Sequence, residues 1–286
     1  MDIPAEQIAW LLAEIRRGTP PERLLATLIE RGAPEEAALD FLTRTLESEL
    51  LVLQGSNPTV TTSITSAISP VPEPLGLDWP SVVSTPDRDV QVLFSLDHPR
   101  VVLFGGLLAD DECDALVAMA QARIEASQVI DLQTGHTRQD DGRSSSGMAF
   151  SRGENSLLQK LESRIAALLR WPLDHGEAIQ VLRYQIGQEY RPHHDYVDPS
   201  KPGAAPFLAR GGQRVGSLVM YLNTPERGGG TNFPEAKLEI AAHKGNAVFF
   251  SYGRPDPTTG TLHGGMPVLA GEKWVATKWL REFPHI

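Results

Sequence analysis

The order of the candidate elements along the chain is the feature that most restricts its fold. Helical patterns come first, from about Asp110, as the cap, to about Ala126, and from about Asn155 to Leu169. After Ala178 the chain changes to short strand-like segments, among them Val215 to Tyr221, Ala247 to Ser251 and Trp274 to Leu280. Helices followed by many short strands predict an α+β fold: a jelly-roll barrel, or double-stranded β-helix, buttressed by helices on one face.

Two further segments precede this barrel. Residues 1–50 predict a small N-terminal bundle of three short helices, the second of which opens with a capping box at Thr19 and stops at Gly32. Residues 51–88 are rich in Ser, Thr and Pro and predict an extended linker, which can still pack along the barrel through Leu75, Leu77 and Trp79. The predicted domains are therefore residues 1–50, 51–88 and 89–286.

His193, His194 and Asp195 form an H-x-D motif. Residues two apart on a strand share a face, so His193 and Asp195 can hold one ion while His194 points the other way. A pairing of His194 with Asp198 instead would give up this periodicity. His263 would supply a third ligand from a distant strand. Two imidazoles and one carboxylate suit non-haem Fe(II) and leave positions open on it, although zinc accepts the same ligands.

Lys273 separates the iron interpretation from the zinc one. It lies ten positions after His263, flanked by Trp274 and Val275, where burial would be costly unless an anion met it. The far carboxylate of 2-oxoglutarate is such an anion, and a hydrolytic zinc site has no use for it. Lys278 is five positions further on and faces the other side of the strand, so one lysine can lie inside and the other outside. Trp279 shares the inward face of Lys273.

Several longer strings support this interpretation together. They are RYQIGQEY at 183–190, PHHDY at 192–196, QRV to MYL within 213–222, GGGTNFP at 228–234, and the block from His263 to Trp279. From about Pro99 onward the chain resembles the prolyl 4-hydroxylase family of Fe(II)/2-oxoglutarate-dependent dioxygenases, and looks like a bacterial-type member. Motifs in the family's order are far more specific than a lone H-x-D.

The resemblance implies roles for nine residues. His193, Asp195 and His263 would bind Fe(II). Lys273, Tyr184 and Thr231 would hold the distal carboxylate of 2-oxoglutarate. Tyr190, Arg214 and Trp279 would face the substrate. The family also implies L-ascorbate as a reductant. Where the family's usual strings read Gly-Gly-Glu-Thr, Arg-Thr-Ser and alanine after the second histidine ligand, this chain has Gly230, Ser144 and Gly264, which bear on the substrate pocket and not on the iron ligands.

Composition excludes several classes of protein. Of 286 residues, 41% are hydrophobic and 22% charged, which is ordinary for a globular protein. The single cysteine, Cys113, cannot form an internal disulfide, and neither a signal peptide nor a membrane-spanning run is visible, so we expect a cytoplasmic protein. A formal net charge of −10 argues against nucleic acid as a partner. A homodimer is left open.

The sequence therefore predicts a dioxygenase that hydroxylates peptidyl proline to 4-hydroxyproline, with conversion of 2-oxoglutarate and O2 to succinate and CO2. The partner would be a proline-containing peptide or protein. Three alternatives stay open at this point: the same chemistry on another side chain or a free amino acid, an oxygen- or iron-sensing binding protein, and a zinc hydrolase.

Overall fold

The structure, a computed structural model, describes residues 21–30, 38, 42, 71–76, 79–126, 129, 130, 137, 138 and 144–285. The chain divides into two units, Met1–Ala67 and Ile68–Ile286. In the first unit the helix α2, Pro21–Glu30, agrees with the second N-terminal helix predicted. The other two predicted helices lie outside the described residues, apart from Ala38 and Leu42. Within the described part of the chain, no helix is long and apolar enough to cross a membrane.

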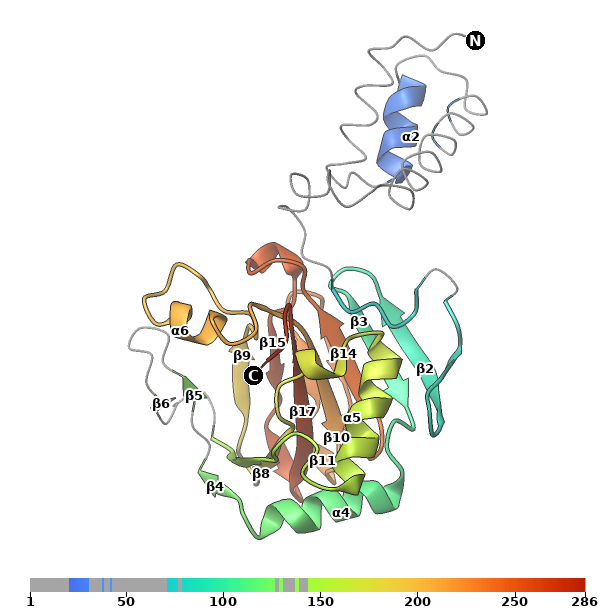
Figure 1. The fold of residues 1–286 in the computed structure, drawn as a ribbon. Helices are drawn as coiled ribbons and strands as arrows, with labels where there is room; N and C mark the ends of the chain where they lie inside the picture. The colour runs from blue at the N-terminus through green and yellow to red at the C-terminus, as the bar shows by residue number, and fades with distance from the viewer. Residues whose placement is uncertain are drawn as a thin grey trace. The chain divides into compact units, whose positions relative to one another are not determined.

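The second unit is built on two antiparallel sheets (Figure 1). In spatial order the large sheet contains β1 Val82–Ser84, β2 Asp89–Leu96, β3 Val101–Gly105, β14 Ala247–Ser251, β10 Arg214–Tyr221, β17 Lys273–Arg281, β8 Gln180–Tyr184, β7 Ser146–Ala149 and β4 Glu125–Ala126. The smaller sheet contains β13 Leu238–Ile240, β12 Thr231–Phe233, β15 His263–Gly265 and β9 Tyr190–His193. Two ribbons pair β11 Arg227–Gly228 with β16 Val268–Ala270, and β5 Val129–Ile130 with β6 Thr137–Arg138.

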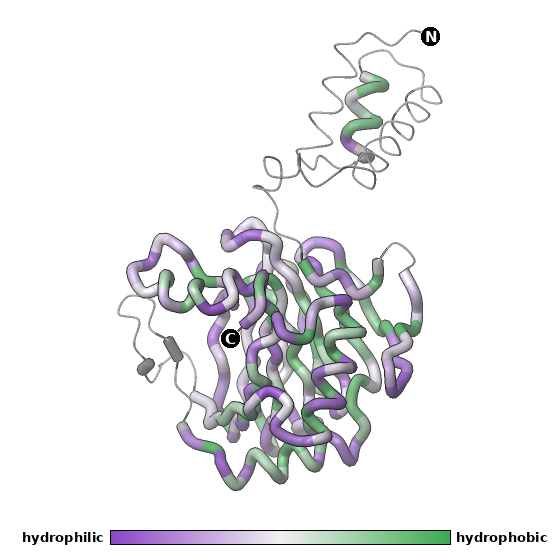
Figure 2. The backbone as a smooth tube through the Cα atoms, in the orientation of Figure 1, coloured by the Kyte–Doolittle hydropathy of each residue, from purple (hydrophilic) through white to green (hydrophobic). Residues whose placement is uncertain are grey.

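Two amphipathic helices, α4 Asp110–Gln121 and α5 Ser156–Leu169, cover one face of the large sheet (Figure 1). Hydrophobic and hydrophilic residues alternate along α5 in Figure 2, and its buried residues join one core cluster with those of the sheet. Asn155 caps α5 by accepting a hydrogen bond from the Leu158 backbone N–H at 3.0 Å.

The boundaries of α4 differ from the prediction. Its cap is Ala109 rather than Asp110, and the Glu112 carboxylate accepts the Ala109 backbone N–H at 2.9 Å. The helix ends at Gln121 rather than Ala126 because Glu125 and Ala126 form β4, which pairs with β7. Pairing at the edge of the sheet therefore overrides helical periodicity here.

The two faces of the large sheet bury different clusters. One cluster lies beneath α4 and α5, and the other lies between the two sheets, where Phe233 of β12 and Ile240 of β13 meet Leu182 of β8. Two antiparallel sheets enclosing a core, with helices outside, are consistent with the double-stranded β-helix of the predicted α+β fold.

Strand β17 alternates between these clusters. Trp274, Ala276 and Leu280 face the helices, whereas Lys273, Val275, Thr277 and Trp279 line a pocket between the sheets. Lys273 and Lys278 face opposite sides, but the suggestion that one of them is outside is wrong. Lys278 is buried and forms an ion pair with Glu162 of α5 at 2.7 Å. Strand alternation predicts which face of the sheet a side chain lies on, but the burial of Lys278 comes from α5, which covers that face.

Part of the segment predicted as linker packs on the second unit. Leu75 is buried, β1 pairs with β2, and Glu73 accepts a hydrogen bond from Arg100 at 2.8 Å. Trp79 is half exposed, with Arg100 over its ring. The division into three domains stays a prediction.

Candidate metal and cosubstrate site

His193 and His263 are brought together by strand pairing. They are direct partners in the register of β9 and β15, and their ring centroids lie 4.4 Å apart. Strand β9 ends at His193, two residues short of Asp195, and Pro192 lies in β9 at the edge of the smaller sheet, which is where a strand tolerates proline. Asp195 still reaches the same cluster as His193. His194 is not part of this cluster and packs against Tyr196 with the two rings tilted, while Asp198 accepts hydrogen bonds from Ser200.

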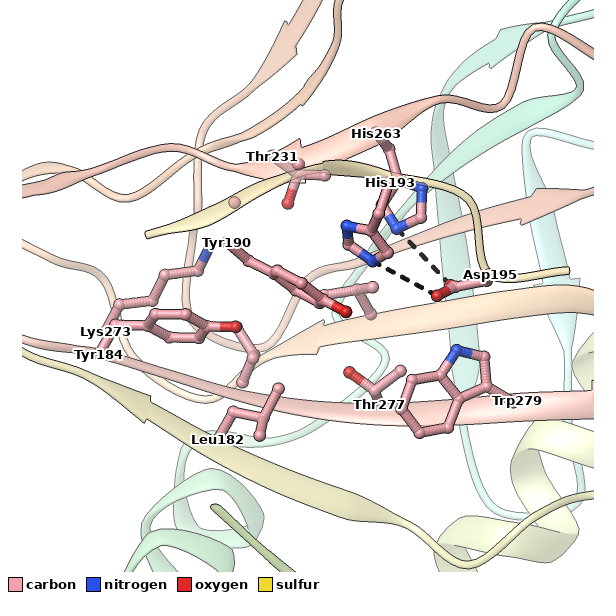
Figure 3. Close-up of a pocket in the computed structure, with 14 residues that line it drawn as sticks. Leu182, Tyr184, Tyr190, His193, Asp195, Thr231, His263, Lys273, Thr277 and Trp279 are labelled. Atoms are coloured by element: carbon pink, nitrogen blue, oxygen red, sulfur yellow. Dashed lines mark ion pairs between the residues drawn. The ribbon is translucent and has the colours of Figure 1, made fainter. Parts of the chain in front are cut away.

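The three side chains form a compact cluster (Figure 3). The Nε2 atoms of His193 and His263 lie 3.4 and 3.5 Å from the Asp195 carboxylate oxygens. One ligand atom from each residue lies within 4.8 Å of the others, and in the described part of the chain this is the one group of such residues suited to a metal ion. His263 and Asp195 are buried.

The hydrogen bonds of the two rings fix which nitrogen carries the proton. Nδ1 of His193 lies 2.9 Å from the Arg191 carbonyl, and Nδ1 of His263 lies 3.0 Å from the Thr261 carbonyl. Because a carbonyl oxygen only accepts, each Nδ1 donates, and each ring turns its Nε2 toward the carboxylate. A divalent metal ion would be held by the two Nε2 atoms and the carboxylate together, with the Nδ1 hydrogen bonds orienting the rings. The donor set therefore fits a divalent metal ion.

The charge states of the cluster agree with this. Burial lowers the pKa of His263 to about 4, against the opposing effect of Asp195, so the ring is neutral at neutral pH. Burial alone would raise the pKa of Asp195, but the neighbouring His263, His193 and Arg214 hold it well below its usual value. The carboxylate is therefore ionised.

Lys273 lies in the same pocket as the cluster (Figure 3). It is 3% exposed, its Nζ is 3.4 Å from the Gly230 carbonyl oxygen, and the Tyr184 ring centroid is 5.5 Å away. No Asp or Glu of the described residues forms an ion pair with it, and burial lowers its pKa to about 8. The pocket thus contains a buried cation that forms no ion pair with a carboxylate of the described residues.

Tyr184 and Thr231 also line this pocket. Tyr184 is the cross-strand partner of Lys273, and Thr231 accepts a hydrogen bond from the Tyr221 hydroxyl at 2.9 Å. Both side chains are buried. The three residues predicted to hold the distal carboxylate are therefore gathered in one pocket with the three predicted metal ligands.

The residues predicted to contact substrate are placed differently from one another. Tyr190 stacks on His193 with ring centroids 3.7 Å apart, and Trp279 lines the pocket. Arg214 is beside the pocket and not in its lining. Its Nε and Nη2 form hydrogen bonds of 2.7 and 3.0 Å to the partly buried Glu177, and its guanidinium lies 4.0 Å from the Trp279 ring centroid.

Sequence patterns did not indicate several further pocket residues. Ser217 donates a hydrogen bond to Asp195, while Leu182, Val219 and Thr277 line the pocket. Strand periodicity places Val219 on the same face as Ser217, but it does not say that this face holds a metal cluster.

Two departures from the family's motifs are explained by close strands. A Cβ at Gly230 would lie 2.8 Å from the Ile240 carbonyl oxygen, and one at Gly264 would lie 2.9 Å from the Tyr190 carbonyl oxygen. Both distances are too short for a side chain without movement of backbone. The glycines therefore allow the smaller sheet to pack closely here.

Comparison with known proteins agrees with this geometry. The sequence profile of the 2OG-Fe(II) oxygenase superfamily matches residues 179–281, which include the whole cluster and Lys273. Prolyl 4-hydroxylase 1 of Arabidopsis thaliana is 41% identical over 204 residues, which cover 64% of this chain and 69% of the relative. The chain belongs to the prolyl 4-hydroxylase family of 2OG-Fe(II) oxygenases.

Other members of the prolyl 4-hydroxylase family match over similar lengths. Prolyl 4-hydroxylase 2 of the same plant is 34% identical, covering 70% of this chain and 72% of the relative. Among solved structures, a viral collagen prolyl hydroxylase from Paramecium bursaria chlorella virus 1, in complex with 2OG, is 31% identical with a TM-score of 0.48, covering 63% of this chain and 95% of that one. The protein is a 2-oxoglutarate-dependent dioxygenase, prolyl 4-hydroxylase-like, and the family implies Fe(II) and 2-oxoglutarate as its cofactors. The zinc hydrolase alternative is thereby set aside.

Proposed function

We propose that this dioxygenase hydroxylates proline within a peptide or protein at C4, converting 2-oxoglutarate and O2 to succinate and CO2. The observation that carries the proposal is the buried Lys273, which pairs with no carboxylate in the described part of the chain and shares one pocket with the His193, Asp195 and His263 cluster. The relatives' names supply the substrate class, since they are prolyl 4-hydroxylases.

Each group in the pocket then has a proposed role. His193, Asp195 and His263 would hold Fe(II), and Lys273 with Tyr184 and Thr231 would hold the distal carboxylate of 2-oxoglutarate. When bound, Fe(II) supplies the O2 chemistry that couples oxidative decarboxylation of 2-oxoglutarate to hydroxylation of a C–H bond. The protein's own contribution is to place the two carboxylic ends of the cosubstrate. A charge-assisted contact to Lys273 is about twice as strong as a neutral one.

Trp279 and Tyr190 are the proposed substrate contacts within the pocket. The Trp279 Nε1 atom is buried and has no hydrogen-bond partner among the residues that the structure describes, so a bound substrate oxygen would satisfy it. A proline ring can pack against either aromatic side chain, and a polyproline II segment is a preformed, low-entropy ligand for such a surface.

The predicted role of Arg214 needs to change in this proposal. Two of its donor nitrogens are engaged by Glu177, and its guanidinium lies over Trp279. We infer that Arg214 holds Trp279 in place rather than binding a peptide carbonyl itself. A cation over an indole ring contributes about 0.5–2 kcal/mol.

Four narrower inferences extend the proposal: L-ascorbate as reductant, a cytoplasmic location, a bacterial-type member of the family, and a homodimer. The first three follow from the resemblance and from composition. The homodimer is an open alternative. Dependence of repeated turnover on ascorbate, and sedimentation of the purified protein, are the direct measurements for the first and the last.

The test is an incubation of the Fe(II)-loaded protein and 2-oxoglutarate with proline-rich peptides, collagen-like peptides, free proline and peptides that lack proline. Substrate-dependent succinate with a gain of about sixteen daltons on proline is the expected result, and Asp195→Ala is the inactive control because two imidazoles alone hold the metal poorly. Hydroxylation confined to free amino acids or to other side chains would overturn the peptidyl-proline assignment and leave the dioxygenase one standing.

A further inference from the structure

Two buried hydroxyl groups, those of Ser217 and Tyr252, form a hydrogen-bonded chain to Asp195. Ser217, at the middle of β10, is 0% exposed, and its Oγ donates to Asp195 Oδ2 at 2.6 Å. The Tyr252 hydroxyl, from the residue directly after β14, lies 2.9 Å from the same Ser217 Oγ. Tyr252 is 2% exposed. The two hydroxyls and the carboxylate thus form a short buried chain.

The direction of this chain follows from counting protons. The Ser217 hydroxyl donates to Asp195 Oδ2, and a carboxylate that binds a metal ion is deprotonated and only accepts hydrogen bonds. Ser217 has one hydroxyl proton, which it donates in the hydrogen bond to this carboxylate. The Tyr252 hydroxyl must then be the donor to Ser217 Oγ. Tyr252 therefore orients Ser217, and Ser217 holds one oxygen of Asp195.

The backbone keeps both hydroxyls in register. Strands β10 and β14 are antiparallel neighbours, with Ser217 opposite Phe250, and the Tyr252 backbone N–H donates to the Val215 carbonyl at 3.1 Å. Asp195 itself comes from the segment after β9, beyond regular strand pairing. Asp195, the one predicted metal ligand outside a strand, is thus held by a hydrogen bond from the large sheet.

We propose that Ser217 is a positioning residue for the metal site, fixing the rotation of the Asp195 carboxylate, and that Tyr252 acts on Asp195 only through Ser217. This rests on the proposed metal site. Partners that orient a metal ligand typically change metal affinity by about 10- to 100-fold when they are removed. A role in packing alone would change the stability of the metal-free fold and leave metal affinity as it is.

The test is a titration of the metal-free, full-length protein with Co2+ in the absence of 2-oxoglutarate, so that no turnover is needed. Ser217→Ala should weaken Co2+ binding by about 10- to 100-fold. Tyr252→Phe, which keeps the ring, should weaken it by about two- to tenfold, the value of one buried hydrogen bond. Ser217→Thr keeps the hydroxyl and should bind Co2+ nearly as the wild type does.

The double variant separates positioning from packing. If Tyr252 acts through Ser217, Tyr252→Phe adds no further loss of Co2+ affinity in the Ser217→Ala background. Tyr221→Phe is the matched control, because it also removes a fully buried tyrosine hydroxyl, one that donates to Thr231 instead. Its Co2+ affinity should equal that of the wild type.

The outcomes distinguish this inference from the proposed function. Wild-type Co2+ affinity in folded Tyr252→Phe and Ser217→Ala, or additive losses in the double variant, overturns the positioning role. If Asp195→Ala also binds Co2+ like the wild type, the metal site itself is wrong. Should Ser217→Ala fail to fold, Tyr252→Phe, with its ring intact, decides the question alone.

Discussion

Strand β17 buries one lysine on each face of the large sheet, and their surroundings differ. On the helix face, Lys278 is 3% exposed and its Nζ lies 2.7 Å from the Glu162 carboxylate of α5. On the other face, which lines the pocket between the sheets, Lys273 is equally buried. Its Nζ lies 3.4 Å from the Gly230 carbonyl oxygen, and it forms no ion pair with any described carboxylate. Arg164 of α5 is also buried, and it is paired with Glu112 and Asp87.

The difference supports the proposal that Lys278 is a structural cation and that Lys273 binds the cosubstrate. Burial lowers the pKa of both lysines, but Glu162 opposes this for Lys278, whereas nothing opposes it for Lys273, whose pKa falls to about 8. A buried charge without a partner is costly to the fold. The cost is offset if a bound ligand supplies the anion. Because the metal cluster lies in the same pocket, we infer that this anion is the distal carboxylate of 2-oxoglutarate.

The largest expected effect is on the helix face. Lys278→Met leaves Glu162 buried without its cation and should lower the free energy of unfolding by about 3–5 kcal/mol, measured by denaturant titration. The double variant Lys278→Met with Glu162→Leu should recover most of that loss, because it removes both charges. A single variant as stable as the wild type would show that the ion pair does not matter to the fold.

Lys273→Met should have the opposite effect on stability. Removing a buried cation that has no partner should raise the melting temperature of the ligand-free protein, while the affinity for 2-oxoglutarate falls by about ten- to a hundredfold, or about 1.5–3 kcal/mol. Thermal unfolding and calorimetric titration measure the two. A destabilised variant with unchanged affinity would place Lys273 among the structural cations.

The pH dependence of cosubstrate binding should follow the Lys273 ammonium. Since its pKa in the ligand-free protein is about 8, below the ordinary value of 10.5, affinity for 2-oxoglutarate should be level below pH 7 and fall by up to about tenfold per pH unit above 8. Stability of the ligand-free protein has the reverse sign and gains between pH 8 and 10.5, because the unfolded chain binds the extra proton there. Lys273→Met should show neither dependence, and a fall of the same size in that variant would assign it to another group.

The smallest expected effect is at Trp279, which lines the same pocket as Lys273. Trp279→Phe removes the Nε1 donor that has no partner in the described part of the chain, so the KM for a peptide substrate should rise by about two- to tenfold while the KM for 2-oxoglutarate stays constant. Steady-state kinetics, with the peptide and 2-oxoglutarate concentrations varied in turn, measure the two KM values. A change confined to 2-oxoglutarate would move Trp279 to the cosubstrate end of the pocket.

How much of the fold and of the candidate site could be predicted from the sequence depends on how far apart along the chain the interacting residues lie. Two-residue periodicity correctly placed Lys273 and Trp279 on one face of β17, and it placed Lys278 on the other. The burial of Lys278 depends on where α5 packs, over a hundred positions earlier, which periodicity does not contain. The hydroxyls of Ser217 and Tyr252 carry no local pattern at all, because serine and tyrosine are ordinary in strands. Long-range packing supplied what the local pattern could not.

The most direct test of the central claim compares two cosubstrates on the Co2+-loaded protein. 2-Oxoglutarate and 2-oxopentanoate have the same chain length and the same 2-oxo acid end, but 2-oxopentanoate lacks the distal carboxylate. We expect the wild type and the Lys278→Met, Glu162→Leu variant to prefer 2-oxoglutarate by about ten- to a hundredfold, and Lys273→Met to bind the two nearly alike. A Lys273→Met variant that keeps the wild-type preference would contradict the assignment of Lys273 to the cosubstrate.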